Sequence, residues 1–356
     1  MRKITVIVAA ILSVAGIWAT SGGTAAADPA PSPTCQAISD IPVTLNGAPY
    51  DVAGWLCWQG ELADQTVQVL TSGITYNHTY WDWPLEPGRY SYVQAATQAG
   101  YATFTYDRLS TGQSDHPDAL SVTLSAEADV LHQLIQGLRS GAVGGHAFDK
   151  VITVGHSYGS AISGVEANTH NDVDGVILSG ITHSFAPINP VLFSASIWPA
   201  QLDPKFASAG LPLGYITTLP GSRTNLFYYT PNADPAVIAL DEILKDTLTL
   251  GQFNTVNEYM QPGSTTAITA PVLVAMGQKD ILFCDNLLLS CATDTAVASR
   301  ENQYFSTQTC LEGYALNNSG HNLNVHRNAA NWFATANSWA DRRVGTAGAP
   351  ATQPCP

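Results

Sequence analysis

The chain has 356 residues, of which 45% are hydrophobic and 12% are charged, and its formal net charge is −14 at pH 7. Such a composition excludes a disordered chain, which combines low hydrophobicity with high charge, and the length suffices for one large core with an insertion. The negative charge argues against nucleic acid or an anionic membrane surface as a partner.

The first 27 residues have the pattern of a secretory signal peptide. Arg2 and Lys3 are basic, residues 4–18 are largely apolar, and residues 25–27 are all alanine. The apolar run is shorter than the ~20 residues that a membrane-spanning helix needs, which disfavours an uncleaved membrane anchor. We therefore expect a secreted protein that is cleaved near Ala27 and whose mature chain has no integral membrane association.

The chain contains six cysteines, and an even number in an exported protein suggests a set of disulfide bonds. Many pairings are possible, and proximity in the sequence favours Cys35–Cys57, Cys284–Cys291 and Cys310–Cys355. No two cysteines have CxxC spacing and no histidine clusters with them, so we predict no zinc site and no other metal site.

After a proline-rich, polar stretch over residues 28–42, which we expect to be a flexible lead-in, short apolar runs alternate with helical patterns. This alternation is typical of an α/β fold with a parallel sheet. The apolar runs are rich in β-branched residues and do not alternate, as in strands that are buried on both faces. The predicted strands cover residues 67–71, 101–106, 151–154, 176–178, 272–276 and 310–315.

Helical spacing of apolar residues predicts a helix around residues 130–138 that Gly141 ends, and further helices over 160–168 and 329–340. The stretch between the strands that end at 178 and begin at 272 is far longer than an ordinary crossover. We interpret it as a cap domain inserted over an active site. The predicted boundaries are 43–182 and 269–345 for the core, 183–268 for the cap and 346–356 for a C-terminal tail.

The cap segment has its own local signals. Asp234 followed by Pro235 is a typical helix start, with Asp as N-cap and Pro at the first helical position. The segment is also rich in aromatic residues, which we expect to line the substrate site: Phe193, Trp198, Phe206, Phe227, Tyr228 and Tyr229.

The strongest local signal is Gly155-His156-Ser157-Tyr158-Gly159, which follows the strand predicted over 151–154 and precedes a run of small residues. This is the G-x-S-x-G nucleophile elbow in its strand–turn–helix context. The tight turn strains the serine backbone, lifts Oγ above the start of the helix, and leaves no room for side chains at Gly155 and Gly159. We therefore predict that Ser157 is a nucleophile and that His156 contributes to the pocket wall.

A serine nucleophile needs a general base, and behind such an elbow the order along the chain is nucleophile, acid, histidine. Of the nine histidines, His321 lies directly after the last predicted strand, where the base belongs. His326 lies five residues further on, and its alternative interpretation is a surface or helix-packing side chain. Asp280 follows the strand over 272–276 and is the predicted acid, with Asp285 as the alternative.

Hydrolysis of an acyl group also requires donors for the oxyanion, each worth ~3–4 kcal/mol. The backbone N–H of Tyr158, directly after the nucleophile, is one candidate. The loop after the strand over 67–71 supplies the other, and the N–H of Ile74 is its best-placed donor.

These segments, together with Tyr106-Asp107-Arg108 and Gly112-Gln113-Ser114, resemble in order the α/β-hydrolase superfamily over most of residues 43–340. The resemblance implies an eight-stranded, mostly parallel sheet flanked by helices, with a cap inserted after the sixth strand. It also implies that Asp107 and Arg108 support the loop beneath the site. Many members have His-Gly where this chain has Ser72-Gly73.

The function that these residues predict is a secreted serine hydrolase acting through an acyl-enzyme on Ser157, without metal or organic cofactor. A neutral, aromatic cap favours an uncharged, apolar carboxylic ester as the small-molecule substrate. Two alternatives remain: a serine aminopeptidase or amidase, for which Asp241, Glu242 and Asp246 could hold the substrate amine, and a catalytically inactive binding protein with the same fold. The sequence does not indicate an oligomeric state.

Overall fold

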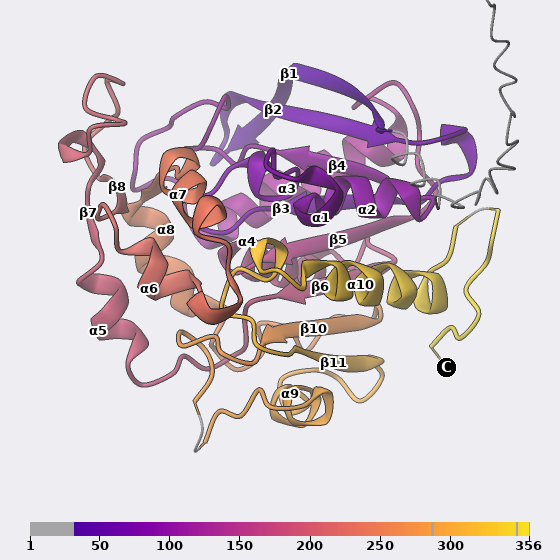
Figure 1. Cartoon of the computed structure of the whole chain (residues 1–356). Coiled ribbons are helices and arrows are strands. Elements are labelled where there is room, and N and C mark those ends of the chain that lie inside the picture. The colour runs from indigo at the N-terminus through magenta and orange to yellow at the C-terminus, as the bar shows by residue number, and fades with distance from the viewer. Residues whose placement is uncertain (1–31, 286–287, 347, 356) are drawn as a thin grey trace, which may run out of the picture. The chain divides into compact units, whose positions relative to one another are not determined.

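The computed structural model describes residues 32–285, 288–346 and 348–355, and these belong to one compact unit (Figure 1). The predicted signal peptide, residues 1–27, lies outside the described residues, as does the start of the predicted lead-in. Among the described residues, no helix combines the length and the apolar character needed to cross a membrane.

Eight strands form the main sheet, in the spatial order β1-β2-β4-β3-β5-β6-β10-β11. They are β1 (Thr34–Leu45), β2 (Ala48–Trp58), β3 (Val67–Thr71), β4 (Ala102–Tyr106), β5 (Val151–His156), β6 (Gly175–Ser179), β10 (Val272–Gly277) and β11 (Leu311–Leu316). The six strands predicted from the sequence are all present, with ends that differ by one or two residues. The predicted eight-stranded, mostly parallel α/β-hydrolase sheet is therefore confirmed.

Only β2 runs against its neighbours in this sheet: it pairs antiparallel with both β1 and β4, and every other pair is parallel. The carboxyl ends of β3, β5, β6, β10 and β11 therefore lie along the same edge. In open parallel sheets, functional loops gather at this edge, and all the loops carrying predicted site residues emerge here.

The prediction of a flexible lead-in over residues 28–42 is wrong for the part that the structure describes. Residues from Thr34 onward form β1, which pairs with β2 through a tight turn at Asn46 and Gly47. The Cys35–Cys57 disulfide joins the far end of this hairpin. The polar sequence suggested a flexible stretch, but these residues are polar because β1 lies at the edge of the sheet, where much of the strand is exposed.

The predicted disulfides are confirmed: Cys35–Cys57, Cys284–Cys291 and Cys310–Cys355 are all bonded, which leaves no free cysteine among the described residues.

Helices cover both faces of the sheet. On one face α1, α2 and α10 pack together, and on the other α3 packs against α4 (Figure 1). The helices of the core are α1 (Pro87–Tyr90), α2 (Tyr92–Gln98), α3 (Leu124–Ser140), α4 (Tyr158–His170), α9 (Asp294–Glu301) and α10 (Ala329–Arg343), with the short 3-10 helices η1 (Leu62–Asp64), η2 (His78–Tyr80) and η6 (Leu323–Val325). The predicted stop of α3 is confirmed, since Gly141 caps it in the left-handed conformation.

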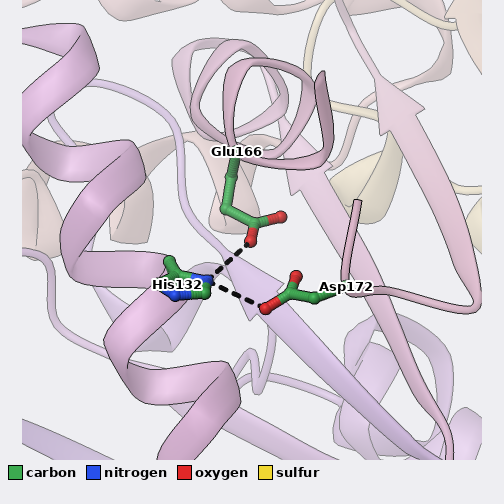
Figure 2. Close-up of side chains that lie close together, drawn as sticks. All are labelled: His132, Glu166 and Asp172. Carbon is green, nitrogen blue, oxygen red and sulfur yellow. Dashed lines mark ion pairs between the residues drawn. The ribbon is translucent and has the colours of Figure 1, made fainter. Parts of the chain in front are cut away.

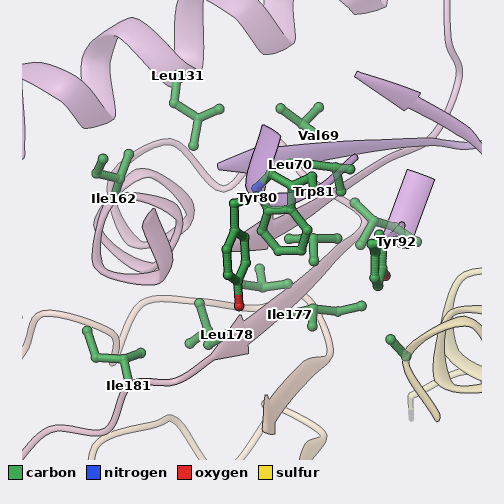
Figure 3. Close-up of a cluster of buried hydrophobic side chains, with 14 of the residues drawn as sticks. Val69, Leu70, Tyr80, Trp81, Tyr92, Leu131, Ile162, Ile177, Leu178 and Ile181 are labelled. Carbon is green, nitrogen blue, oxygen red and sulfur yellow. The ribbon is translucent and has the colours of Figure 1, made fainter. Parts of the chain in front are cut away.

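The core lies between the strands and both helix layers, because β3 to β6 and β10 are buried along their whole length. Figure 3 shows Leu131 and Ile162 on one side of the strands and Tyr92 on the other, with Val69, Leu178 and their neighbours between them. This double burial explains why the strands are apolar without alternation.

The segment between β6 and β10 contains helices and a second, three-stranded antiparallel sheet, β7-β8-β9. Its elements are α5 (Asn189–Ser194), β7 (Ile197–Pro199), η3 (Ala200–Leu202), β8 (Tyr215–Thr218), α6 (Arg223–Phe227), η4 (Thr230–Asn232), α7 (Pro235–Leu244), β9 (Leu248–Thr249), α8 (Leu250–Thr255) and η5 (Val256–Glu258). The predicted start of α7 is confirmed, since the Asp234 side chain accepts a hydrogen bond from Ala236 N–H. The term "insertion" below means residues 183–268.

The burial of two leucines predicts how much each contributes to the stability of the fold. Leu178 in β6 is fully buried, so Leu178→Ala should lower the free energy of unfolding by about 2–5 kcal/mol, through lost apolar contact and the cavity left behind. Leu120 is 63% exposed, and Leu120→Ala should change it by less than about 0.5 kcal/mol. Chemical denaturation of the oxidised protein measures both values, and equal losses would contradict the assignment.

Candidate active site

Ser157 lies between the end of β5 and the first residue of α4, at the carboxyl edge of the sheet. Its φ of 54° and ψ of −120° are strained for a residue with a side chain. The strain is maintained by the surrounding hydrogen bonds: Ser157 N–H donates to Ser179 O at 2.7 Å, and Ser157 O accepts from Ser160 N–H.

The two glycines of the elbow have no room for a side chain. A Cβ on Gly155 would lie 2.3 Å from Ser160 Cα, and a Cβ on Gly159 would lie 2.1 Å from Thr71 O. Both obstacles are backbone atoms, which cannot move aside as a flexible side chain can. A side chain at either glycine would therefore collide with the backbone, as the sequence predicted. At Gly159 the obstacle is the loop after β3, which packs closely on the elbow.

Asp280 and His321 meet across the loops that follow β10 and β11. His321 Nδ1 lies 2.8 Å from Asp280 Oδ2, and both side chains are almost completely buried. Asp280 Oδ1 accepts a hydrogen bond from Leu282 N–H, so the carboxylate is held at both oxygens. Asp285, the alternative acid, instead accepts hydrogen bonds from backbone N–H groups inside its own loop.

The imidazole of His321 packs on residues around Ser157. Its ring centroid is 4.9 Å from that of His156, the residue before Ser157, and 5.7 Å from that of Phe283, which lines the same pocket as Ser157. Within the described residues, no hydrogen bond joins Ser157 Oγ to His321. In unliganded enzymes the catalytic hydrogen bond is often long and tightens in the substrate complex.

His156 does not form the pocket wall that the sequence predicted. It is fully buried beneath the site, where it stacks on Tyr80 with ring centroids 4.3 Å apart. Burial, together with the neighbouring His321, lowers its pKa well below the usual value, so His156 is neutral at physiological pH.

The alternative interpretation of His326, as a surface or helix-packing side chain, is wrong. Its Nε2 accepts hydrogen bonds from Gly320 N–H and Tyr229 N–H, both at 3.0 Å, and its Nδ1 lies 2.7 Å from Asn322 O. Burial lowers its pKa to about 4. The neutral ring therefore holds the loop that carries His321 and joins it to the insertion.

The loop after β3 is held from the core side by Arg108. This buried guanidinium donates to Ser72 O at 3.0 Å and to Gly73 O at 3.1 Å, and pairs with Glu127 at 2.9 Å. Asp107 binds the backbone N–H groups of His78 and Gln113. Asp107 and Arg108 thus support the loop as expected. Ile74 of this loop lines the pocket, and its N–H has no acceptor among the described residues.

The insertion holds the same loop from the opposite side. Arg223 of α6 makes a two-pronged pair with Asp241 of α7, at 3.0 and 2.8 Å, and donates to Thr75 Oγ1 at 2.8 Å. Tyr76 donates to the same Asp241 carboxylate at 3.0 Å, and its hydroxyl accepts from Asn322, beside His321. Arg223 is not among the residues predicted from the sequence, where its isolation in a nearly uncharged stretch is the one signal that marks it.

Ser157 lies at a pocket of about 280 Å³ between the sheet edge and the insertion. Its lining residues carry no charge: Ile74, Ser157, Tyr158, Ile181, Phe185, Asn189, Phe193, Ser194, Leu248, Gln252, Phe253, Asn254, Val256, Asn257, Leu282 and Phe283. Of the aromatic residues that the sequence favoured as lining, only Phe193 is among them. Phe227 and Tyr228 instead pack on His321 and His326.

The comparison with solved structures shows the fold. A carboxyl esterase from Bacillus coagulans in complex with glycerol matches with a TM-score of 0.60 and 14% identity, covering 86% of this chain and 97% of that one. A monoacylglycerol lipase from Paleococcus ferrophilus has a TM-score of 0.52 and 16% identity, covering 82% and 97%. An enol-lactonase from Burkholderia xenovorans has a TM-score of 0.53 and 13% identity, covering 84% and 99%.

No curated protein matches the chain. A family model does: that of the alpha/beta hydrolase family matches residues 68–336, which run from β3 through the elbow and the insertion into α10. The match covers most of the chain and includes every loop at the site. The protein therefore belongs to the alpha/beta hydrolase family.

Proposed function

We propose that the protein is a secreted serine hydrolase that cleaves an uncharged, apolar carboxylic ester, with Ser157 as nucleophile, His321 as general base and Asp280 as the acid that orients it. The observation that carries the proposal is the strained Ser157 at an uncharged pocket, next to a buried His321–Asp280 pair. The three disulfides suit an extracellular location.

The mechanism is an acyl transfer in two steps. His321 takes the Ser157 proton as Oγ attacks the carbonyl carbon, and Asp280 stabilises the imidazolium that forms. The N–H groups of Ile74 and Tyr158 bind the oxyanion; that of Tyr158 is one of the donors left unpaired at the start of a helix. His321 then protonates the leaving alcohol, and water, activated in the same way, releases the acid.

The three acidic residues proposed to hold a substrate amine are engaged elsewhere, which favours an ester over the amine-bearing substrate of an aminopeptidase. Asp241 pairs with Arg223, and Glu242 pairs with Lys245 at 2.6 Å. Asp246 is buried and accepts hydrogen bonds from Asn77 and from Gly112 N–H. None of the three lines the pocket, so a substrate ammonium would have no carboxylate to meet there.

The nucleophile assignment is tested with two serines of the same pocket. Ser157→Ala should lower kcat for an uncharged p-nitrophenyl ester by at least about 1,000-fold, because it removes the hydroxyl on which the acyl-enzyme forms. Ser194→Ala, which also changes a lining hydroxyl, should keep kcat within about threefold. Both are measured on folded, secreted protein, and a fluorophosphonate should label Ser194→Ala but not Ser157→Ala. Wild-type turnover by Ser157→Ala would end the proposal, and an unlabelled wild type would favour an inactive binding protein.

Substrate preference separates the ester from the aminopeptidase alternative. We expect kcat/KM for a short-chain p-nitrophenyl ester to exceed that for an aminoacyl p-nitroanilide by at least about 100-fold, because the pocket offers no partner for a desolvated ammonium. The matched control is the N-acylated form of the same anilide, which separates the effect of the charge from that of the amide bond. Faster turnover of the free aminoacyl compound would favour the aminopeptidase.

The loop that carries His321 should lose stability in acid through His326. The pKa of His326 is about 4 in the folded chain and about 6.5 in the unfolded chain, so the unfolded chain binds the proton first as the pH falls. The contribution of the neutral ring is complete above about pH 6.5 and falls by about 3 kcal/mol as the pH drops through 4. His326→Gln should be less stable than wild type at about pH 7.5, and this gap should narrow towards pH 4. Denaturation at both pH values measures the gap; a constant gap would contradict the assignment.

A further inference from the structure

Three side chains with metal-binding atoms converge between α3 and α4, outside the candidate active site. His132 comes from α3, Glu166 from the second half of α4, and Asp172 from the turn after it (Figure 2). One nitrogen or oxygen atom from each lies within 4.8 Å of the others. Because α4 begins next to Ser157, this cluster lies towards the opposite end of the same helix.

The three side chains of the cluster lie in close contact. Asp172 Oδ2 lies 2.8 Å from His132 Nδ1, yet this nitrogen has no hydrogen-bond partner. Glu166 Oε1 lies 3.7 Å from the same nitrogen. These separations place all three side chains within reach of one shared ion.

Glu166 is the residue that most needs a partner. It is fully buried, it points at His132 and Asp172, and neither of its carboxylate oxygens has a hydrogen-bond partner in the described part of the chain (Figure 2). A buried carboxylate without a hydrogen bond is costly. Arg139, the nearby cation, already binds Asp174 at 2.7 Å and the backbone oxygen of Asp172.

We propose that His132, Glu166 and Asp172 bind one divalent transition-metal ion of the Zn²⁺ type. One imidazole nitrogen and two carboxylate oxygens are ligands that such an ion prefers, and three protein ligands leave a position for water. Ca²⁺ prefers more ligands, all of them oxygen, so it fits less well. The prediction from the sequence of no metal site missed this cluster, because nothing in the spacing of these residues marks them as neighbours.

The residues around the cluster suit ligands that must be held in place. Gln136 donates to Asp172 Oδ2 at 2.6 Å, and the ring of His170 stacks on that of His132 with centroids 3.8 Å apart. His170 Nε2 lies 3.3 Å from Asp129 Oδ1, which adds a further negative charge nearby. Such outer contacts orient metal ligands and raise affinity. His132 is 30% exposed, which gives an ion access from the surface.

The consequence is a link between two helices. An ion held by His132 and Glu166 joins α3 to α4, the helix whose first turn supports the proposed nucleophile. Because the ion binds the folded chain and not the unfolded one, it should raise the thermal midpoint as its concentration rises above Kd. This effect does not depend on the proposed hydrolysis and can be read without any substrate.

The test is a titration of the full secreted chain after treatment with a chelator and dialysis. Calorimetry with Zn²⁺ should find one ion per chain, and the thermal midpoint should rise with Zn²⁺ and fall again with chelator. Co²⁺ should give the visible absorption of a low-coordinate site with the same stoichiometry. Absence of Zn²⁺ binding would overturn the proposal and leave Glu166 as a protonated, buried carboxyl group.

Substitutions distinguish this site from adventitious binding at a surface histidine. Glu166→Gln keeps the buried shape and should weaken Zn²⁺ at least about 10- to 100-fold, as should His132→Ala. His146→Ala removes another partly exposed histidine outside the cluster and should leave Kd unchanged. Undiminished affinity in Glu166→Gln would show that exposed groups alone hold the ion, and would overturn the proposal. If Glu166→Gln does not fold, Asp172→Asn carries the same comparison.

Discussion

The backbone at Ser157 is the constraint on which the site depends. A residue with a side chain adopts φ 54° there because β5 must turn into α4 at once, and the glycines on either side have backbone atoms where a Cβ would be. The same close packing presses the loop after β3 onto the elbow at Gly159. One strained turn therefore sets the position of the hydroxyl, the start of the helix and the loop bearing the proposed oxyanion donor.

Buried charges then hold that loop from two sides. Arg108, paired with Glu127, binds its carbonyl oxygens from the core, and Arg223, paired with Asp241, binds Thr75 from the insertion. Removing either partner of such a pair leaves an uncompensated buried charge. The insertion is thus part of the site itself, which agrees with its belonging to the same compact unit as the sheet.

The fold leaves the reaction open, because lipase, esterase and lactonase structures share it with this chain at low identity. The properties that distinguish this site come from its own residues. The pocket at Ser157 has no charged side chain, and Asp241, Glu242 and Asp246 of the insertion are occupied by Arg223, by Lys245, and by backbone and amide donors, respectively. These features support an uncharged substrate more directly than the fold does.

The sequence alone was enough to predict the buried strands, the elbow at 155–159 and the pairing of Asp280 with His321, because each depends on a local pattern or on order along the chain. It did not reveal that residues from Thr34 onward form β1, that Arg223 reaches Thr75, or that His132 meets Glu166. Those contacts join segments with no periodicity or spacing in common. Only packing of the tertiary structure decides them, because burial and charge pairing act between neighbours in space, wherever they lie in the chain.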